Sequence, residues 1–362
     1  MGTRRPRPRA ALPGRCSRQV AVAARRIDTD GTDGTAGTHG TRVAVIAATA
    51  SAPWSVPVSL VSALLCPAII VIALAALGSL SLAWHSLKQA SALDDGSRRL
   101  GIEGAYAQAG PYRMFFRFAR RRAPAPARLP VVLVHGLVIS SRYMEPLAHS
   151  LARDFDVFAP DLPGFGESPL ASAREVLSIT RLADALRLWL NACGFERAMF
   201  VGNSFGCQVL ADFAVRYPQA VDRLVLQAPI PDPAARSVPR QAWRDWLNGR
   251  RERPRTPAVP GRVDYAKAGL WRAIATLRML VRDPIDERLT RVVAPALVVA
   301  GTRDPVAPLA WAAEAARRLP HGTLMTIEGG THTLNYAAPH AFAFAITPFL
   351  KAAVRDLFRI TN

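Results

Sequence analysis

The chain has 362 residues, of which 50% are hydrophobic, and a formal net charge of +19 from 46 Lys and Arg against 27 Asp and Glu. The basic excess fits an anionic membrane surface or acidic substrates, and a compositional bias toward Arg and Ala is the alternative explanation. No zinc-type spacing, helix-turn-helix signature or aromatic RNA-binding motif accompanies the charge. We therefore expect no metal, no other cofactor and no nucleic-acid partner.

The cysteines stand at positions 16, 66, 193 and 207 and form no close pair. They predict no disulfide framework and no metal ligand set. Cys193 and Cys207 have apolar neighbours in the sequence and are expected to be small core residues.

The N-terminal segment, residues 1–55, opens with a stretch rich in Arg, Gly, Thr, Ala and Pro that has no apolar periodicity. Such a composition buries too little apolar surface to fold, so the segment is predicted to be disordered.

The next segment, residues 56–86, is predicted to be a transmembrane or signal-anchor helix. No charged residue occurs between Val43 and Trp84, and the apolar stretch has the length of one bilayer span. A cleaved signal peptide is the alternative, since residues 90–92 have the small-x-small pattern, although Lys88 near that site argues against it. The Arg-rich N-terminus favours an inside orientation for this end and places the rest of the chain outside the membrane, on the periplasmic side.

Residues 100–355 are predicted to form one α/β domain, because apolar strand-like runs alternate with helical patterns. The first two runs, 101–108 and 112–118, are expected to pair as antiparallel strands. The later ones predict a mostly parallel, doubly wound sheet, with strands at 130–135, 155–159, 197–201, 223–227, 296–301 and 323–327 and helices at 142–153, 178–193 and 207–217.

The strand and helix alternation breaks at residues 230–290, which are predicted to form a small helical cap inserted in the domain. The segment carries Trp243, Trp246, Trp271 and many Arg. We expect the Trp and Leu side chains to line an apolar substrate pocket. The alternative for each Trp is simple packing of the cap onto the core.

The segment Gly202-Asn-Ser-Phe-Gly206 follows an apolar strand and precedes an apolar helix. In this context a G-x-S-x-G string predicts a nucleophile elbow, in which a sharp turn exposes the serine hydroxyl. The flanking glycines suit positions where a Cβ would collide with backbone. Ser204 is therefore the candidate nucleophile.

A serine nucleophile needs a histidine base and a carboxylate that orients it. Asp304 follows the predicted strand at 296–301, and His332 follows the one at 323–327. Both loops fall at the carboxyl edge of the sheet, where Ser204 also emerges. Asp232, after the strand at 223–227, is the alternative acid, with a turn role between two prolines as its other reading.

The oxyanion of an acyl-transfer intermediate needs two backbone donors near the nucleophile. The apolar strand 129–134 ends at His135 and Gly136. We assign the two donors to the N–H groups of Leu137 and Phe205, the second being the residue after the nucleophile. His135 is expected to brace this loop, with substrate contact as the alternative.

In these motifs the chain resembles the α/β-hydrolase superfamily, in its serine-hydrolase branch, over residues 102–350. The resemblance implies the α/β-hydrolase fold and Ser204, Asp304 and His332 as the catalytic triad. Residues 161–168 match a loop of that family and are expected to be scaffold, with Glu167 as a less favoured general acid. The matching segments are Leu133-Val-His-Gly136, Ala159 to Ser168, Gly202 to Gly206, Gly301-Thr-Arg-Asp304 and Gly329-Gly-Thr-His332.

The expected activity is hydrolysis of a small apolar carboxylic ester through an acyl-enzyme, without a cofactor. The motif around Ser204 is also similar to that of hydrolases that split carbon–carbon bonds in ring-cleavage products. Cys207 and the residues after His332 depart from that narrower pattern. A catalytically silent binding protein on the same fold is the third possibility.

Overall fold

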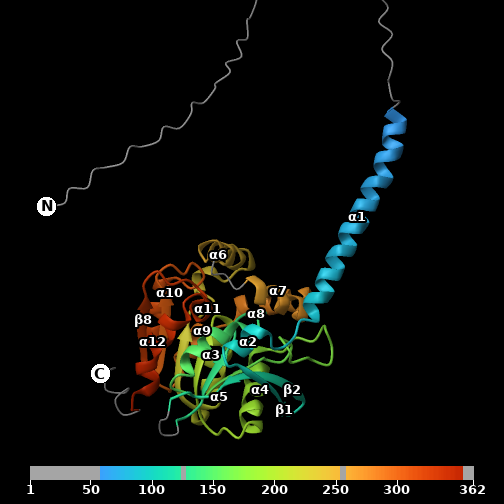
Figure 1. The fold of residues 1–362 in the computed structure, drawn as a ribbon. Helices are drawn as coiled ribbons and strands as arrows, with labels where there is room; N and C mark the ends of the chain where they lie inside the picture. Colours follow the sequence, from blue (N-terminus) through green and yellow to red (C-terminus); the bar gives the residue numbers. More distant parts are fainter. Residues whose placement is uncertain (1–57, 124–127, 253–257, 354–362) are drawn as a thin grey trace, which may run out of the picture. The chain divides into compact units, whose positions relative to one another are not determined.

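The computed structural model describes residues 58–123, 128–252 and 258–353 (Figure 1). The predicted disordered segment, residues 1–55, lies outside the described residues. The first described element is helix α1, Val58–Lys88.

Helix α1 covers most of the predicted membrane-spanning segment, residues 56–86. Among the helices of the described residues, none combines the length and apolar composition needed to cross a bilayer. This finding does not support the predicted transmembrane helix. The part of α1 whose side chains are described carries serines and ends in His85 and Lys88, which break the apolar run.

Eight strands form one sheet in the order β1-β2-β4-β3-β5-β6-β7-β8. The β1–β2 and β2–β4 pairs are antiparallel, and every later pair is parallel, as in the predicted doubly wound sheet. The strands are β1 Glu103–Ala109, β2 Tyr112–Ala119, β3 Val131–Val134, β4 Val157–Pro160, β5 Ala198–Asn203, β6 Val221–Gln227, β7 Ala296–Gly301 and β8 Gly322–Ile327.

Helices cover both faces of this sheet because the central strands are apolar on both sides. Along β3, Val132 and Val134 join one buried cluster, while Val131 and Leu133 join the other. The first cluster includes side chains of α4 Ile179–Ala192, α5 Phe205–Arg216 and α10 Leu309–Arg318. The second includes side chains of α3 Glu145–Leu151 and α12 Pro339–Lys351.

The remaining elements are short or lie between β6 and β7. The described part of the interval between these strands, where the cap was predicted, contains four α-helices, which we call the inserted helices. They are α6 Val238–Arg251, α7 Ala258–Ala268, α8 Leu270–Arg282 and α9 Ile285–Leu289. The short elements are α2 Asp95–Arg99, η1 Ser141–Met144, η2 Pro218–Ala220, η3 Pro233–Ala235 and α11 Leu334–Ala337.

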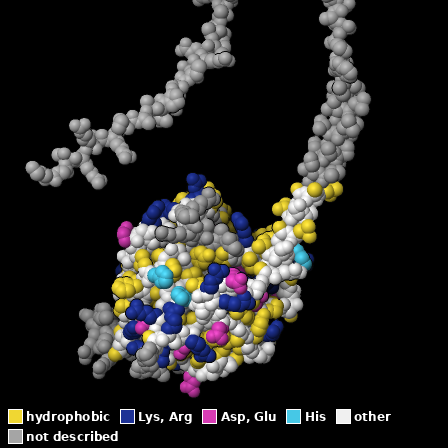
Figure 2. Space-filling view, viewed as in Figure 1, with side chains coloured by type: hydrophobic (Ala, Val, Ile, Leu, Met, Phe, Trp, Pro, Cys, Tyr) yellow, Lys and Arg dark blue, Asp and Glu magenta, His cyan; other side chains and the backbone are white. Residues whose placement is uncertain are grey.

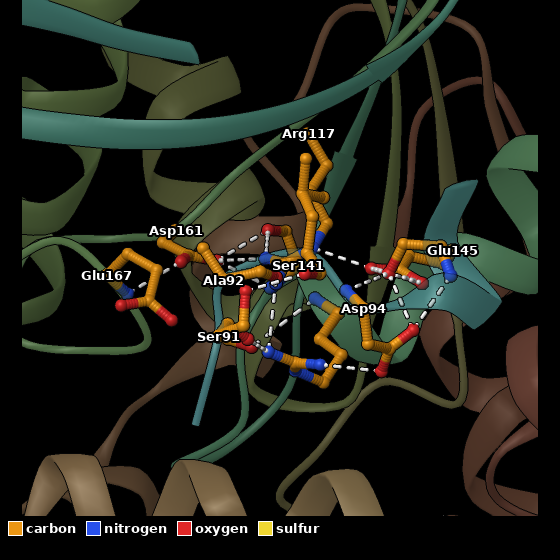
Figure 3. A network of polar contacts seen from close by, with 12 residues as sticks. Ser91, Ala92, Asp94, Arg117, Ser141, Glu145, Asp161 and Glu167 are labelled. Atoms are coloured by element: carbon orange, nitrogen blue, oxygen red, sulfur yellow. Dashed lines mark hydrogen bonds and ion pairs between the residues drawn. The ribbon is translucent and has the colours of Figure 1, made fainter. Parts of the chain in front are cut away.

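Arg117 on β2 is 1% exposed and organises a buried polar cluster, which we call the Arg117 network (Figure 3). Its guanidinium lies 2.7 Å from Glu145 and 3.6 Å from Asp161, and it donates a hydrogen bond to Ser141 Oγ. Asp161 also accepts hydrogen bonds from the backbone N–H groups of Ser141 and Glu167. Residues 161–168 are thus anchored at Asp161 by one buried ion pair and by hydrogen bonds, in agreement with the predicted scaffold role.

Two of the cysteines lie among residues with described side chains, and both are free. Cys207 is fully buried, as predicted, and its thiol donates to the carbonyl of Gly202. Cys193 is only half-buried at the end of α4.

Candidate active site

Ser204 stands at a sharp turn between β5 and α5. Its backbone has φ +55° and ψ −117°, a left-handed φ that is rare for a residue with a side chain. A Cβ at Gly206 would lie 2.4 Å from the Val134 carbonyl oxygen, and one at Gly202 would lie 2.7 Å from the Leu210 side chain. The glycines therefore allow the close approach that the elbow requires.

The structure brings Ser204, His332 and Asp304 together at the carboxyl ends of β5, β7 and β8. His332 Nε2 lies 2.9 Å from Ser204 Oγ, and His332 Nδ1 lies 2.8 Å from Asp304 Oδ2. All three residues are buried. The geometry permits transfer of the serine proton to the imidazole while the carboxylate holds the opposite ring nitrogen.

Asp304 is oriented by its own loop. Its Oδ1 accepts hydrogen bonds from the N–H groups of Val306 at 2.7 Å and Ala307 at 3.1 Å, which leaves Oδ2 for the imidazole. The alternative acid, Asp232, instead accepts from the Ala234 N–H and pairs with Arg244 at 2.8 Å. Asp232 therefore has the turn role that was its other reading.

The loop that carries His332 is held from two sides. On the sheet side, Gln227 donates to the His332 carbonyl at 2.6 Å, and Asn203 donates to it at 3.2 Å. On the other side, Asn248 of α6 accepts from the His332 N–H at 3.1 Å. Glu252, just after α6, accepts from both the N–H and the hydroxyl of Thr333.

Asn248 and Glu252 were not predicted, because only the Trp and Leu side chains of this segment were expected to face the site. The missed signal was the spacing of polar residues along α6. Gln241, Asp245, Asn248 and Glu252 recur at intervals of four, three and four positions, which places them on one helical face.

Several negative charges surround the imidazole of His332. Burial lowers the pKa of His332, but the charge of Asp304 and its hydrogen bond, together with the charges of Asp245 and Glu252, outweigh that effect and raise the pKa above its ordinary value. The site thus favours the imidazolium that forms when Ser204 loses its proton.

Both predicted oxyanion donors lie near the nucleophile: Phe205 follows Ser204 in the sequence, and Leu137 lies near it in space. Phe205 is the first residue of α5, so its N–H has no partner within the helix. Leu137 lines the same cavity as Ser204, and a Cβ on the preceding Gly136 would lie 3.5 Å from Ser204 Cβ. Both positions are compatible with the predicted donor role.

The loop after β3 is braced by two buried residues. His135 Nε2 accepts a hydrogen bond from the Leu162 N–H at 3.0 Å, and Nδ1 lies 2.9 Å from the Gly136 carbonyl. His135 therefore has the bracing role that was expected. Asp264 of α7 accepts from the N–H and the hydroxyl of Ser140, and burial raises the pKa of this carboxyl to about 7.

Glu167, the less favoured acid, pairs with Lys267.

A cavity of about 560 Å³ opens onto Ser204 and His332. Of the three Trp residues considered, only Trp246 lines it. Trp243 stacks on Trp246 and is 60% exposed, whereas Trp271 is 57% exposed and donates to the Arg174 carbonyl. The apolar part of the wall also includes Leu137, Ile139, Ile230, Leu277, Leu280 and Val306. Across residues 58–123, 128–252 and 258–353, we find no group of three or more His, Cys, Asp or Glu suited to hold a metal ion.

Two protein-family models match successive parts of the chain. One, described as alpha/beta hydrolase fold, matches residues 130–262, and the other, described as TAP-like protein, matches residues 276–355. A relative described as putative carbamate hydrolase RutD, from Caulobacter sp. (strain K31), is 28% identical over 250 residues, which cover 63% of this chain and 92% of the relative.

Solved structures share the fold. A membrane phospholipase A superposes with a TM-score of 0.60 at 21% identity, covering 80% of this chain and 98% of that chain. A thermophilic esterase from Thermogutta terrifontis gives a TM-score of 0.54 at 23% identity, covering 70% of this chain and 99% of that chain. With the elbow, the sheet order and these matches together, the chain has the α/β-hydrolase fold and is a hydrolase.

Proposed function

We propose that this hydrolase cleaves small apolar carboxylic esters through an acyl-enzyme on Ser204. The observation that carries the proposal is the pair of contacts at 2.9 Å and 2.8 Å that link Ser204, His332 and Asp304 beside a cavity of about 560 Å³. The printed names of the similar proteins, a putative carbamate hydrolase and an esterase among them, favour attack on a carboxyl-type carbon.

In the first half of the reaction, Ser204 Oγ attacks the carbonyl carbon while His332 Nε2 takes its proton. Asp304 holds the imidazole through Nδ1 and stabilises the imidazolium. The N–H groups of Leu137 and Phe205 bind the negative oxygen of the tetrahedral intermediate. His332 then gives the proton to the leaving alcohol oxygen as the carbon–oxygen bond breaks.

In the second half, a water molecule attacks the acyl-enzyme and loses a proton to His332. The tetrahedral intermediate collapses, the acid leaves, and the proton returns to Ser204 Oγ. Ester and water become acid and alcohol, so the cycle balances without a redox step or a metal.

The alternative, hydrolysis of carbon–carbon bonds in ring-cleavage products, requires the enzyme to bind an anionic diketone acid. None of the described residues that line the cavity is Lys or Arg, so nothing in the described wall offers an ion pair to a carboxylate. This observation favours the ester over the ring-cleavage product.

The test is labelling by a fluorophosphonate probe combined with hydrolysis of p-nitrophenyl esters. We expect the chain to be labelled and to release nitrophenol, and we expect Ser204→Ala to lose both. A chain that is folded but neither labelled nor active would be a silent binding protein. Bleaching of a coloured ring-cleavage product, with no turnover of esters, would establish the carbon–carbon activity instead.

The membrane location, with the catalytic domain outside, stays a prediction from the sequence. Fractionation of cells that express the full chain, followed by protease treatment of intact spheroplasts, tests both parts of it.

A further inference from the structure

One face of α6 forms a polar wall of the cavity. Gln241, Asp245, Asn248 and Glu252 all line the cavity that holds Ser204. Asn248 and Glu252 have a structural task, since they bind the loop of His332 and Thr333. The other two have none that the fold explains.

Asp245 and Gln241 are without polar partners. Within the part of the chain that the structure describes, the Asp245 carboxylate makes no ion pair or hydrogen bond, and the buried Gln241 Oε1 accepts none. Gln241 is 4% exposed and lines the cavity, so its oxygen is shielded from bulk water. A shielded acceptor without a donor is costly in a finished fold and is satisfied when a ligand brings the donor.

The cavity is negative in a strongly basic protein. The chain carries a net charge of +19, and Lys and Arg are spread over the face of the molecule shown in Figure 2. Yet the charged residues lining the described wall are Asp245 and Glu252, with Asp304 directly behind His332. Arg250 lies over the Trp246 ring at 5.0 Å and is exposed, and Arg244 pairs with Asp232, so neither neutralises the wall.

The pKa values of the wall agree with this charge imbalance. Reduced hydration raises the pKa of Asp245, and the nearby charges of Glu252 and Asp304 raise it further against the opposing effect of His332. A bound cation would relieve this repulsion. The aromatic ring of Tyr265 also lines the cavity, and such a ring attracts cations.

We propose that the enzyme selects esters that carry a cationic nitrogen, a protonated or alkylated amine, which Asp245 attracts by its charge while the ester carbonyl meets Ser204. Where the amine carries an N–H, Gln241 Oε1 accepts a hydrogen bond from it. This inference rests on the proposed esterase activity and adds the charge of the substrate. Asp245 acts here as a specificity-determining residue, whereas Ser204 and His332 carry out the chemistry.

The experiment compares esters that differ only in charge, with the full chain. On the acyl side, the probes are p-nitrophenyl 4-(trimethylammonio)butanoate, its neutral isostere p-nitrophenyl 5,5-dimethylhexanoate, and the anionic mono-p-nitrophenyl glutarate. On the alcohol side, 2-(trimethylammonio)ethyl butanoate is compared with neutral 3,3-dimethylbutyl butanoate. The readout is the ratio of kcat/KM values within each series, corrected for spontaneous hydrolysis.

We expect the cationic ester to exceed its neutral isostere by about threefold or more in at least one series, because the unpaired Asp245 carboxylate attracts a cation at the cavity wall, although its exposure to solvent screens part of the attraction. The anionic ester is expected to be the poorest. Asp245→Asn, which keeps the size of the side chain, should reduce the ratio toward one. The control Asp95→Asn, on exposed α2, should leave the ratio unchanged.

A ratio near one in both series, or a preference for the anionic ester, would overturn the inference while the esterase proposal stands. A ratio that survives Asp245→Asn would remove Asp245 from the selection. Failure of every ester, with no labelling by a fluorophosphonate, would instead refute the proposed function itself.

Discussion

The Arg117 network and the acidic wall of the cavity both gather carboxylates, but only the network supplies a cation for them. Arg117 lies between Glu145 and Asp161, and further hydrogen bonds from Ser141 complete the cluster (Figure 3). In the cavity, Asp245 has no such partner among the described residues. Arg117 thus holds two carboxylates inside the fold, whereas the exposed and unpaired carboxylate of Asp245 is available to a ligand.

The largest effect that separates the two regions is expected from Ser204→Ala. Loss of the nucleophile should lower kcat for a p-nitrophenyl ester by about 10⁶-fold. Ser204 is not part of the Arg117 network, so the free energy of unfolding should stay nearly constant. Ester hydrolysis followed over long times gives the residual kcat, and thermal unfolding gives the change in stability. A residual rate within tenfold of the parent would exclude Ser204 as the nucleophile.

The opposite pattern is expected from Arg117→Met. Removal of the guanidinium leaves Glu145 and Asp161 buried without a counter-charge, which should reduce the free energy of unfolding by about 3–5 kcal/mol. The matched control is Arg113→Met near the exposed start of the same strand, where the Arg lies over Tyr106 and its loss should cost less than about 1 kcal/mol. Urea unfolding of the parent protein and the two variants provides the comparison. Equal midpoints for the two variants would contradict the predicted role of Arg117.

A smaller loss of activity is expected when Glu252, which binds the loop that carries His332, is replaced. Glu252→Ala removes the acceptor for the N–H and hydroxyl of Thr333, so His332 loses part of its support. A displacement near 1 Å should lower kcat by about 10²-fold with little change in KM. Glu252→Gln keeps an acceptor oxygen and should recover most of kcat. If KM rises and kcat stays constant, Glu252 binds substrate instead of positioning the loop.

The smallest effect concerns the pH dependence of kcat/KM. A general base must be neutral, so activity falls as the pH drops through the pKa of His332. That pKa is raised, so the acid limb should lie above the ordinary histidine value of about 6.5.

Asp245→Asn removes one of the charges that raise the His332 pKa and should move the acid limb to lower pH. Asp95→Asn should leave the limb in place, because Asp95 is exposed on α2 and pairs with Arg98. Profiles measured with one neutral ester distinguish these outcomes. An acid limb that does not respond to Asp245→Asn would show that this carboxylate is too well hydrated to influence the imidazole.

Much of the architecture was predictable because apolar periodicity and glycine positions over short stretches of sequence determine it. The antiparallel pair β1–β2, the parallel strands and the core helices α3, α4 and α5 appear where apolar periodicity placed them, with boundaries shifted by a few residues, whereas α10 and α12 were not predicted. The elbow was readable because two glycines must flank Ser204 for steric reasons. The carboxyl ends of parallel strands share one edge, so the meeting of Ser204, Asp304 and His332 followed from topology.

The predictions that failed concern contacts between residues far apart in the chain, which a local sequence pattern does not specify. Trp243 and Trp271 do not line the cavity, because a helix presents only one face to it. In α6 that face is the polar one.

The sequence by itself determined the alternation of strands and helices, the sharp turn at Ser204 and the loops that carry Asp304 and His332, since these depend on spacing and backbone sterics. Only the tertiary structure decided which side of α6 faces the cavity, and therefore that Asn248 and Glu252 hold the histidine loop while Asp245 stays unpaired. The physical reason is that helical periodicity defines the faces of an insertion, but packing across a long gap in the chain chooses which face meets the sheet.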